Sequence, residues 1–330
     1  MDAVLFTCAG QRADVVSAFR DAGATTIATD LNPLSPALYH ADRRLAPPPV
    51  GDPSYVPFVA ATVLEYDVSL VIPLTDLDQQ ALAERRTEID ALVLLPAPEV
   101  IEMTNDKWLA HLFFEECGIH SPPTWLPGAL PEELPFPVLV KPRRGFGSKG
   151  IFRAENPQEL EFFLRYTNVP SMVQRLCAGE EFSIDVFCDL DGRCLGAVPR
   201  TMIESKGGES IKGMSIKDWE LIEIGRRVAE TLGIVGPANI QCFRNGDGRH
   251  EVTDVNARFG GGFPVHWAAG GGYPELALAL ARGERPEPRL GAFREGVFMT
   301  RFFWQVCLEE GPEGLDPLSR SVPEPVVGDE

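Results

Sequence analysis

The sequence predicts a protein of mixed class, α/β followed by α+β, in which a parallel sheet precedes antiparallel strand pairs. In residues 1–97, apolar strand-like runs alternate with helix-like runs, which is typical of a parallel sheet with right-handed crossovers. Later, two strand-like runs at 239–243 and 250–256 flank the turn sequence Asn-Gly-Asp-Gly, which is typical of an antiparallel hairpin. A chain of 330 residues is long enough for two or three compact units.

The first part begins with a strand at 4–7 and a helix at 13–22 that Gly23 ends, and further strands are expected at 25–29 and 69–72. Ligands bind such sheets at the carboxyl ends of the strands. The polar residues at those ends are candidate substrate contacts: Arg12, Asp30, Thr75 and Asp76. The segment after the first strand is not Gly-x-Gly-x-x-Gly, which disfavours a dinucleotide-dependent oxidoreductase.

Pro96-Ala97-Pro98 marks the first expected boundary, and a helix at about 105–117, ended by Gly118, is expected after it. A proline-rich connector with little regular structure should follow at 121–137. Beyond it we expect a helix at 218–232, a fraying tail from about 315, and strands at 138–141, 150–153, 172–174 and 182–187. The apolar run at 298–304 fits either a C-terminal strand or a dimer contact.

Composition and charge exclude several classes of function. The net charge of −18 would repel nucleic acid, so we expect no nucleic-acid partner. The sequence contains no run of about eighteen apolar residues, the length that a membrane span needs. Its first residues lack the basic start of a signal peptide, and its seven cysteines are scattered, which favours reduced thiols in the cytoplasm.

The segment Lys141–Gly150 is a glycine-rich loop with cations, set between two expected strands. Gly145, Gly147 and Gly150 allow close backbone approach and positive φ, and Ser148 adds a hydroxyl. Such a loop can cover phosphates, although a flexible basic hairpin would have the same composition. It is not a P-loop, because Gly-Lys-Ser/Thr before a helix is missing.

Asp254, Asn256 and Arg258 alternate along one expected strand, so their side chains should point to the same face. Gln241 lies on the preceding strand of the hairpin and could face the same way. Oxygen ligands of this kind suit Mg²⁺, which shares its coordination with substrate phosphates. The alternative is a strand whose Asp and Asn begin a turn before three glycines.

Four segments in order carry a resemblance to the ATP-grasp superfamily: Asn105–Lys107, Lys141–Gly150, Met172–Asp185 with its Gly-Glu-Glu, and Gln241 with Asp254–Arg258. The chain is most similar to the carbamoyl-phosphate synthase large-subunit branch and to stand-alone ligases of the pyrrolysine-biosynthesis type. The resemblance covers residues 1 to about 285. It implies a Rossmann-like preATP-grasp domain and then a two-lobed ATP-grasp fold.

The domain organisation that this resemblance implies has four parts. Residues 1–97 would form the preATP-grasp domain, and residues 98–190 the N-terminal part of the ATP-grasp fold, in which the lobe at about 121–190 is the lid. Residues 191–314 would form the C-terminal lobe with the metal site, and residues 315–330 a flexible tail.

The resemblance also implies roles for individual residues. Lys107, Lys141 and the loop residues Gly145, Gly147 and Ser148 would hold the phosphates of ATP. The backbone of the hinge residues Gln174, Arg175 and Leu176 would contact adenine, and the carboxylate of Glu181 would contact the ribose. Mg²⁺, or Mn²⁺ in its place, would be held by Gln241, Asp254 and Asn256. Arg258 would steady the transferred phosphoryl group, and Arg200 and Lys206 would lie in a basic loop near it.

Two positions depart from the family pattern. Asp254 stands where the family has Glu, which shortens one metal ligand, and Arg175 stands where the hinge commonly carries Glu. His266 follows the glycine cluster, and a packed or capping histidine is a simpler interpretation than a substrate contact. The Gly260–His266 segment as a whole is a candidate substrate contact.

The predicted function is an ATP-dependent ligase that joins a small carboxylate to a small amine through an acylphosphate. Carboxyphosphate or carbamate chemistry, as in carbamoyl-phosphate synthase, is one alternative, although that enzyme carries two ATP-grasp units and this chain has one set of motifs. A protein that binds nucleotide without turnover is another, and the Asp for Glu exchange at position 254 gives it some support. Whether the protein forms a homodimer is left open.

Overall fold

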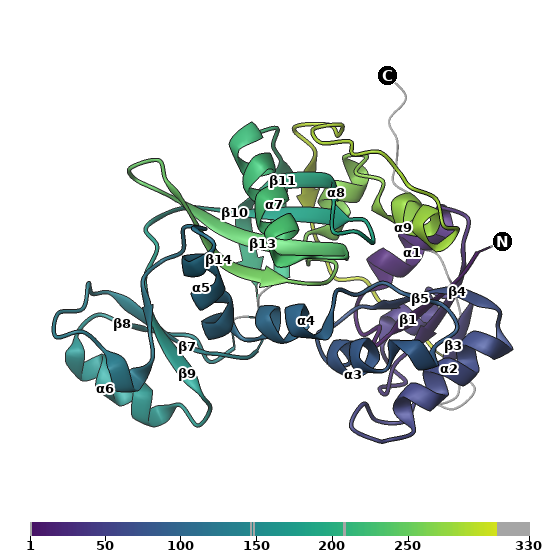
Figure 1. The fold of residues 1–330 in the computed structure, drawn as a ribbon, viewed down its shortest axis with the longest axis horizontal. Helices are drawn as coiled ribbons and strands as arrows, with labels where there is room; N and C mark the ends of the chain where they lie inside the picture. Colours follow the sequence, from purple (N-terminus) through teal and green to yellow (C-terminus); the bar gives the residue numbers. More distant parts are fainter. Residues whose placement is uncertain (1, 146, 148, 207–208, 309–330) are drawn as a thin grey trace. The chain divides into compact units, whose positions relative to one another are not determined.

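The computed structural model describes residues 2–145, 147, 149–206 and 209–308. The chain divides into two compact units. The first contains Met1–Asp78, Arg85–Val93 and the residues from Phe302 onward, and the second contains Gln79–Glu84 and Leu94–Arg301. Each unit has its own sheets and helices (Figure 1).

The first unit is built on a parallel sheet with the strand order β3-β2-β1-β4-β5. Its strands are β1 (Ala3–Thr7), β2 (Thr25–Thr29), β3 (Arg43–Leu45), β4 (Val68–Pro73) and β5 (Leu92–Val93). Its helical segments are α1 (Ala13–Asp21), η1 (Pro36–Tyr39), α2 (Tyr55–Glu65) and η2 (Arg86–Glu88). Every residue of β1 is buried, and Phe19 of α1 meets Phe6 edge-on with 5.3 Å between ring centroids. The parallel sheet expected for this part is confirmed.

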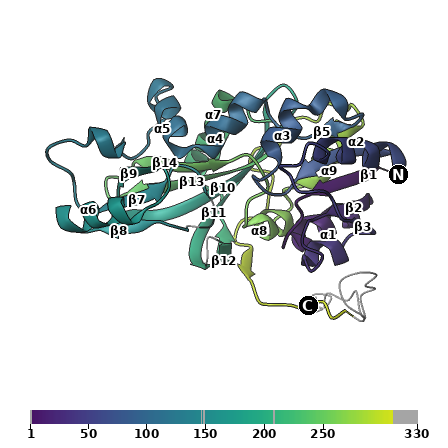
Figure 2. The same ribbon diagram turned by 90° about the horizontal axis from the view of Figure 1, so that it is seen from below.

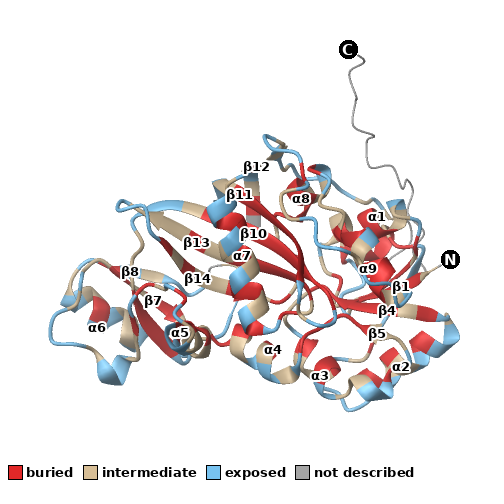
Figure 3. Cartoon of the chain, turned by 45° about the horizontal axis from the view of Figure 1, so that its top comes forward, coloured by how far each residue is buried: buried red, intermediate tan, exposed pale blue. Residues whose placement is uncertain are grey.

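The second unit contains a central antiparallel sheet with the order β14-β13-β10-β11-β12-β15. Its strands are β10 (Gly179–Cys188), β11 (Cys194–Lys206), β12 (Glu209–Ser215), β13 (Gly236–Asn245), β14 (His250–Asn256) and β15 (Phe298–Thr300). Helix α7 (Trp219–Leu232) packs on β10 and β11, where the strands are buried (Figure 3). Gly225 allows this close packing, because a Cβ there would lie 2.7 Å from Cγ2 of Ile184.

The same unit contains a small antiparallel sheet with the order β6-β9-β7-β8. Its strands are β6 (Thr124–Trp125), β7 (Val138–Pro142), β8 (Phe152–Ala154) and β9 (Ser171–Arg175). Helix α6 (Pro157–Tyr166) covers β7 and β8 (Figure 2), and η3 (Pro127–Ala129) precedes them in the chain. A compact apolar core joins the helix to the sheet: Val138, Val140, Ala154, Leu160 and Val173.

The remaining helices of this unit are α3 (Gln79–Glu84), α4 (Pro98–Asn105), α5 (Lys107–Glu116), α8 (Phe263–Ala268) and α9 (Tyr273–Ala281). The single helix expected at 105–117 is wrong at its start, because Asp106 is extended, with φ −117° and ψ 104°, and separates α4 from α5. Its carboxylate accepts from the N–H groups of Trp108 and Leu109, so it caps the second helix. Helices α4 and α6 each have a proline in the first turn, where its fixed φ and missing N–H suit the start of a helix.

The connector at 121–137 has little regular structure, as expected: it contains the two-residue strand β6 and the short η3. Of the two interpretations of the apolar run at 298–304, the structure agrees with a strand, β15, over Phe298–Thr300 beside β12. The tail from 315 lies outside the described residues. Among the helices that the structure describes, none combines the length and the apolar character needed to cross a bilayer.

Candidate functional site

One face of the central sheet carries the residues expected to hold a metal. In β13 and β14 the directly opposed pairs are Asn239 with Asn256 and Gln241 with Asp254. Opposed residues of antiparallel strands share a face, and so do alternate residues along one strand. The structure therefore places Gln241, Asp254 and Asn256 on one face of two adjacent strands. All three are partly exposed, whereas Val255 between the last two is buried.

Lys107 connects this face to the glycine-rich loop. It occupies the first turn of α5, and its Nζ lies 3.6 Å from Oδ1 of Asp254. The same ammonium donates a hydrogen bond to the carbonyl oxygen of Gly145 at 3.0 Å. The ammonium thus lies beside the carboxylate that was predicted to bind a cation, and it also contacts the loop that was predicted to cover phosphates.

Lys141 in β7 lies deep in the same region, with only 6% of its surface exposed. Burial lowers the pKa of its ammonium to about 8, an effect that the Asp254 carboxylate opposes and Lys107 reinforces. A buried ammonium next to a second ammonium has too little negative charge around it. A bound polyphosphate would supply the missing charge.

The lowered pKa of Lys141 predicts how the stability of the ligand-free protein depends on pH. The unfolded chain holds this proton up to about pH 10.5 and the folded chain only up to about pH 8, so the unfolded state binds more protons in between. Stability should therefore gain a rising contribution between about pH 8 and 10.5. Urea unfolding at several pH values measures it, and Lys141→Met should remove that contribution. A Met variant with the wild-type pH profile would contradict the assignment.

The donor set of this face fits Mg²⁺ held together with a nucleotide. The carboxylate of Asp254 and the amide oxygens of Asn256 and Gln241 are hard oxygen donors. No group of three or more His, Cys, Asp or Glu side chains among the described residues could hold a metal by itself. The cation would therefore depend on phosphate oxygens for the rest of its coordination, which is the usual manner for Mg²⁺.

Arg258 lies beside this donor set. Its Nη2 donates to Oδ1 of Asn256 at 3.2 Å, and its Nη1 donates to the carbonyl oxygen of Phe259 at 3.2 Å. The guanidinium is partly exposed. It is thus oriented next to one of the proposed metal ligands, where a planar cation can meet a phosphoryl group.

The glycine-rich loop is anchored at its start and turns sharply within. The guanidinium of Arg143 donates twice to the carboxylate of Asp106, at 2.6 and 3.1 Å. Burial alone would raise the pKa of Asp106, but Arg143 and two backbone N–H groups hold it below its ordinary value. The backbone φ is positive at Gly145, Gly147 and Gly150, as the predicted loop requires. Ser148 lies outside the described residues.

Arg200 does not lie in a loop, as the family resemblance had suggested, but in strand β11. Only 2% of its surface is exposed, and its guanidinium donates to Asp185 at 3.3 Å and to Ser183 at 2.8 Å. Burial alone would raise the pKa of Asp185, but Arg200 and its other neighbours hold it at about 2. Arg200 stands opposite Ser183, and Ser183 stands opposite Gln241, so this buried network lies on the same face of the sheet as the proposed metal ligands. Lys206 ends the same strand, and its side chain lies outside the described residues.

The glycine cluster lies directly on this buried network. A Cβ at Gly260 would come within 2.5 Å of Oδ1 of Asp185, and one at Gly262 within 1.9 Å of Nε of Arg200. His266 is buried, with its ring centroid 4.1 Å from that of Tyr273, and its Nδ1 lies 3.8 Å from Oδ2 of Asp185. This environment is that of a packed histidine, which was the simpler of the two interpretations.

The hinge residues expected to meet adenine are engaged within the protein. The N–H groups of Arg175 and Leu176 donate to the carbonyl oxygens of Pro123 and Pro137, at 2.9 and 3.3 Å. The side chain of Gln174 donates to Oγ1 of Thr124 at 2.8 Å. The structure therefore does not present these two backbone donors to a ligand.

Glu181, the residue expected to meet ribose, stands opposite Phe243 on the same face of the central sheet as Gln241. It is partly buried, and burial raises the pKa of its carboxyl group while Arg200 opposes the rise. The hinge and Glu181 thus flank the site face at its end away from Asn256.

The candidate substrate contacts of the first unit lie at the carboxyl edge of its sheet. Asp30 accepts from the backbone N–H of Gly10 at 2.7 Å, and Arg12 pairs with Asp14 at 3.1 Å. Thr75 and Asp76 follow β4 and are partly exposed.

Sequence reasoning missed a buried group at the same edge of that sheet. The hydroxyl of Tyr55 donates to Oδ2 of Asp78 at 2.6 Å. Burial raises the pKa of Asp78, so this carboxyl group resists ionisation. No local pattern identified it, because the two residues lie far apart in the sequence.

Comparison with known families identifies two parts of the chain. Residues 167–301 match the family described as "ATP-grasp in the biosynthetic pathway with Ter operon". Residues 4–94 match the family described as "PylC-like, N-terminal domain". The resemblance predicted from the sequence is confirmed: the chain carries an ATP-grasp domain behind a PylC-like N-terminal domain.

Individual relatives agree with this assignment. The carbamoyl phosphate synthase large chain of Agathobacter rectalis is 32% identical over 168 residues, which is 46% of this chain and 15% of that one. Biotin carboxylase from Campylobacter jejuni, in a complex with βγ-ATP, superposes with a TM-score of 0.73 at 18% identity, over 89% of this chain and 73% of that one. The L-amino acid ligase of Bacillus licheniformis superposes with a TM-score of 0.67 at 20% identity, over 85% of this chain and 74% of that one. The predicted fold class is confirmed. The chain spans well under a third of the length of the synthase that it matches.

Proposed function

We propose that the protein is an ATP-dependent carboxylate–amine ligase that works through an acylphosphate. The observation that carries the proposal is the convergence of Lys107, Lys141 and the glycine-rich loop on Asp254, with Asn256 and Gln241 on the same face. Two ammonium groups beside oxygen donors for a cation match the needs of a nucleotide triphosphate.

In this proposal the chain positions the reactants and neutralises charge. Lys107 and Lys141 hold the polyphosphate, and the turns at the loop glycines let the backbone approach its oxygens. Arg258 stabilises the phosphoryl group as it passes to the substrate carboxylate. Mg²⁺, when bound by Gln241, Asp254 and Asn256, would supply Lewis-acid neutralisation of the phosphate charge. Mn²⁺ would substitute for it, since both take oxygen ligands.

After the phosphoryl transfer, a substrate amine attacks the acyl carbon and phosphate leaves, so no nucleophilic side chain of the protein is required. The small sheet and its glycine-rich loop would exclude water from the labile acylphosphate. The L-amino acid ligase with the same fold favours amino acids as the class of amine. Arg12, Asp30, Thr75, Asp76 and the Gly260–His266 segment remain candidates for contacts to the acid and the amine.

A second candidate is carboxyphosphate or carbamate chemistry, which the sequence identity to carbamoyl phosphate synthase favours. A third is nucleotide binding without turnover. We further propose a cytoplasmic protein that acts on small molecules, with a homodimer as an open question that sedimentation would answer.

A screen of ADP release over paired amino acids and small carboxylates, followed by mass spectrometry of the products, tests the proposal. We expect ADP release that needs both an acid and an amine, and a product whose mass is their sum less one water. Release that depends on bicarbonate would instead support the carbamate chemistry. Tight ATP binding with no release across the panel would contradict the ligase assignment.

A further inference from the structure

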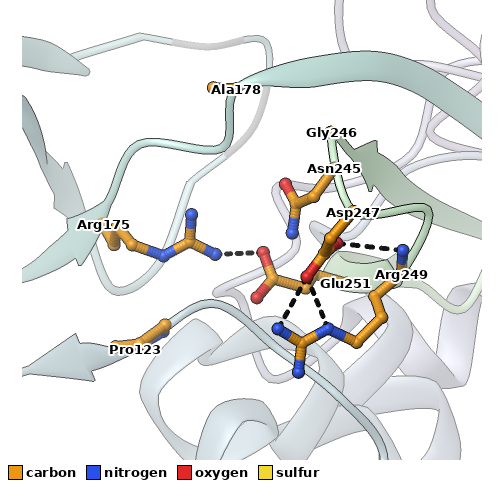
Figure 4. Close-up of a pocket in the computed structure, with 8 residues that line it drawn as sticks. All are labelled: Pro123, Arg175, Ala178, Asn245, Gly246, Asp247, Arg249 and Glu251. Carbon is orange, nitrogen blue, oxygen red and sulfur yellow. Dashed lines mark hydrogen bonds and ion pairs between the residues drawn. The ribbon is translucent and has the colours of Figure 1, made fainter.

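A pocket of about 410 Å³ lies beside the hinge, and all of its lining residues except Arg175 are outside the set that the family resemblance assigns (Figure 4). It is bounded by the hinge residues Arg175 and Ala178, by Pro123, and by the turn between β13 and β14. Glu251 of β14 points into it between these walls (Figure 4). The pocket is therefore a polar recess at the end of the hinge.

The carboxylate of Glu251 is held from the hinge. Arg175 forms an ion pair with its Oε2, and the thiol of Cys177 donates to the same oxygen at 3.6 Å. Burial raises the pKa of Cys177 to about 12, so the thiol keeps its proton and remains a donor. The side chain of Glu251 is 16% exposed. The hinge thus fixes the carboxylate in place and leaves one face of it open to the pocket.

A β-bulge brings Glu251 onto the face of the proposed metal ligands. Residues three apart on a regular strand point to opposite faces. In β14, however, Thr253 is an extra residue, because Gln241 pairs with Asp254 while Cys242 pairs with Val252. Glu251 consequently stands opposite Phe243, which alternates with Gln241 on β13. Glu251 and Asp254 therefore share one face, with the hinge beside the first and Lys107 beside the second.

The hinge of this chain offers fewer groups to a nucleobase than the family resemblance implies. Its carboxylate position is occupied by Arg175, and the backbone donors of Arg175 and Leu176 are already used within the protein. A carboxylate nevertheless remains at this end of the site face, supplied from β14 and held by that same arginine. A negative charge is therefore present beside the hinge, but strand β14 supplies it and the hinge itself does not.

We infer that Glu251 is the residue that selects adenine, by accepting a hydrogen bond from the 6-amino group of the base. This inference rests on the proposed nucleotide site and adds its specificity. A carboxylate accepts from an amino group, but it repels the keto oxygen that inosine and guanine carry at the same position. Asn245 also lines the pocket, and its buried Oδ1 has no hydrogen-bond partner among the described residues.

Inosine triphosphate tests the inference, because its base carries a keto oxygen in place of the 6-amino group and a protonated N1 in place of an acceptor, and is otherwise the same as that of ATP. Binding of each magnesium nucleotide to the full-length protein is measured by calorimetry. We expect the wild type to prefer ATP by at least about 10-fold, since a site built for a hydrogen bond rejects the analogue that lacks it. In Glu251→Gln the preference should fall below about 3-fold, because an amide can donate to the keto oxygen.

Glu88→Gln is the matched control. Glu88 of η2 is a carboxylate paired with an arginine, Arg85, at 2.7 Å and is not one of the residues that line the pocket, so its loss should leave the preference at the wild-type value. If Glu251→Gln weakens both nucleotides equally, Glu251 only holds Arg175 and the inference is wrong. A wild type that binds both nucleotides equally well overturns it too. A wild type that binds neither contradicts the proposed function itself.

The double variant Arg175→Gln with Glu251→Gln covers the case in which the single variant fails to fold. It removes the unpaired arginine together with its partner, so it avoids the penalty of a buried charge without a counter-charge. The same loss of preference is expected from it. Retention of a preference of about 10-fold by a folded double variant would overturn the inference.

Discussion

Replacement of Lys141 by methionine is expected to stabilise the ligand-free protein and to remove nucleotide binding. Burial lowers the pKa of this ammonium from 10.5 to about 8, so at pH 7 the folded chain carries a charge that its surroundings disfavour. Each unit of pKa shift corresponds to about 1.4 kcal/mol, so the fall from 10.5 to about 8 implies a gain on the order of 3 kcal/mol for the variant. Methionine has a similar length and fills the same space, so no cavity should offset the gain.

The affinity for the magnesium nucleotide should fall by at least about 100-fold in the same variant, because a buried charge-assisted contact is lost. Thermal melting with and without the nucleotide measures both effects. Without nucleotide, the melting temperature of the wild type should be lower than that of the variant. On addition of the nucleotide, the melting temperature of the wild type should rise strongly and that of the variant should not change. Lys217→Met is the control, since Lys217 is exposed and its ammonium lies over the ring of Phe293, while its hydrogen bond to Glu295 comes from the backbone N–H and is kept in the variant. A Lys141 variant that is less stable and still binds would contradict the proposed role.

The sequence predicted those parts of the site that depend on strand periodicity. Asp254 and Asn256 share a face because alternation along a strand has period two, and Gln241 joins them through the pairing of one hairpin. The turn glycines at 246 and 248 identified that hairpin. Local rules were sufficient here, because the elements involved are adjacent in the chain.

Other features could not be predicted from local rules. Glu251 was missed because a bulge changes which side chains share a face, and no residue type in β14 indicates a bulge. Arg200 was expected in a mobile loop, but its partner Asp185 lies on a different strand, and only the sheet pairing shows that the two meet. The break at Asp106 had a recognisable signal, since aspartate before a helix is a common cap.

The second large effect is expected at Asn256. Its amide oxygen is a proposed metal ligand and also accepts from Arg258 at 3.2 Å. Replacement by alanine would remove an oxygen from the proposed cation site and release the guanidinium of Arg258, which is proposed to stabilise the transferred phosphoryl group. Turnover on the acid and amine found by the screen should fall roughly 100–1,000-fold, the loss typical of one electrostatic contact to a transition state. The side chain is partly exposed, so the melting temperature should stay close to that of the wild type.

The dependence on Mg²⁺ separates a metal ligand from a residue that only supports Arg258. In the wild type, Mg²⁺ should strengthen ATP binding, and in Asn256→Ala that effect should be largely lost. Asn256→Asp keeps an oxygen at the same distance and should retain the Mg²⁺ effect, because carboxylate is also a preferred ligand of this cation. Thr253→Ala, on the bulge of the same strand, should change neither turnover nor the Mg²⁺ effect. Unchanged turnover in Asn256→Ala would show that the cation, and the phosphoryl transfer it serves, lie elsewhere in the protein.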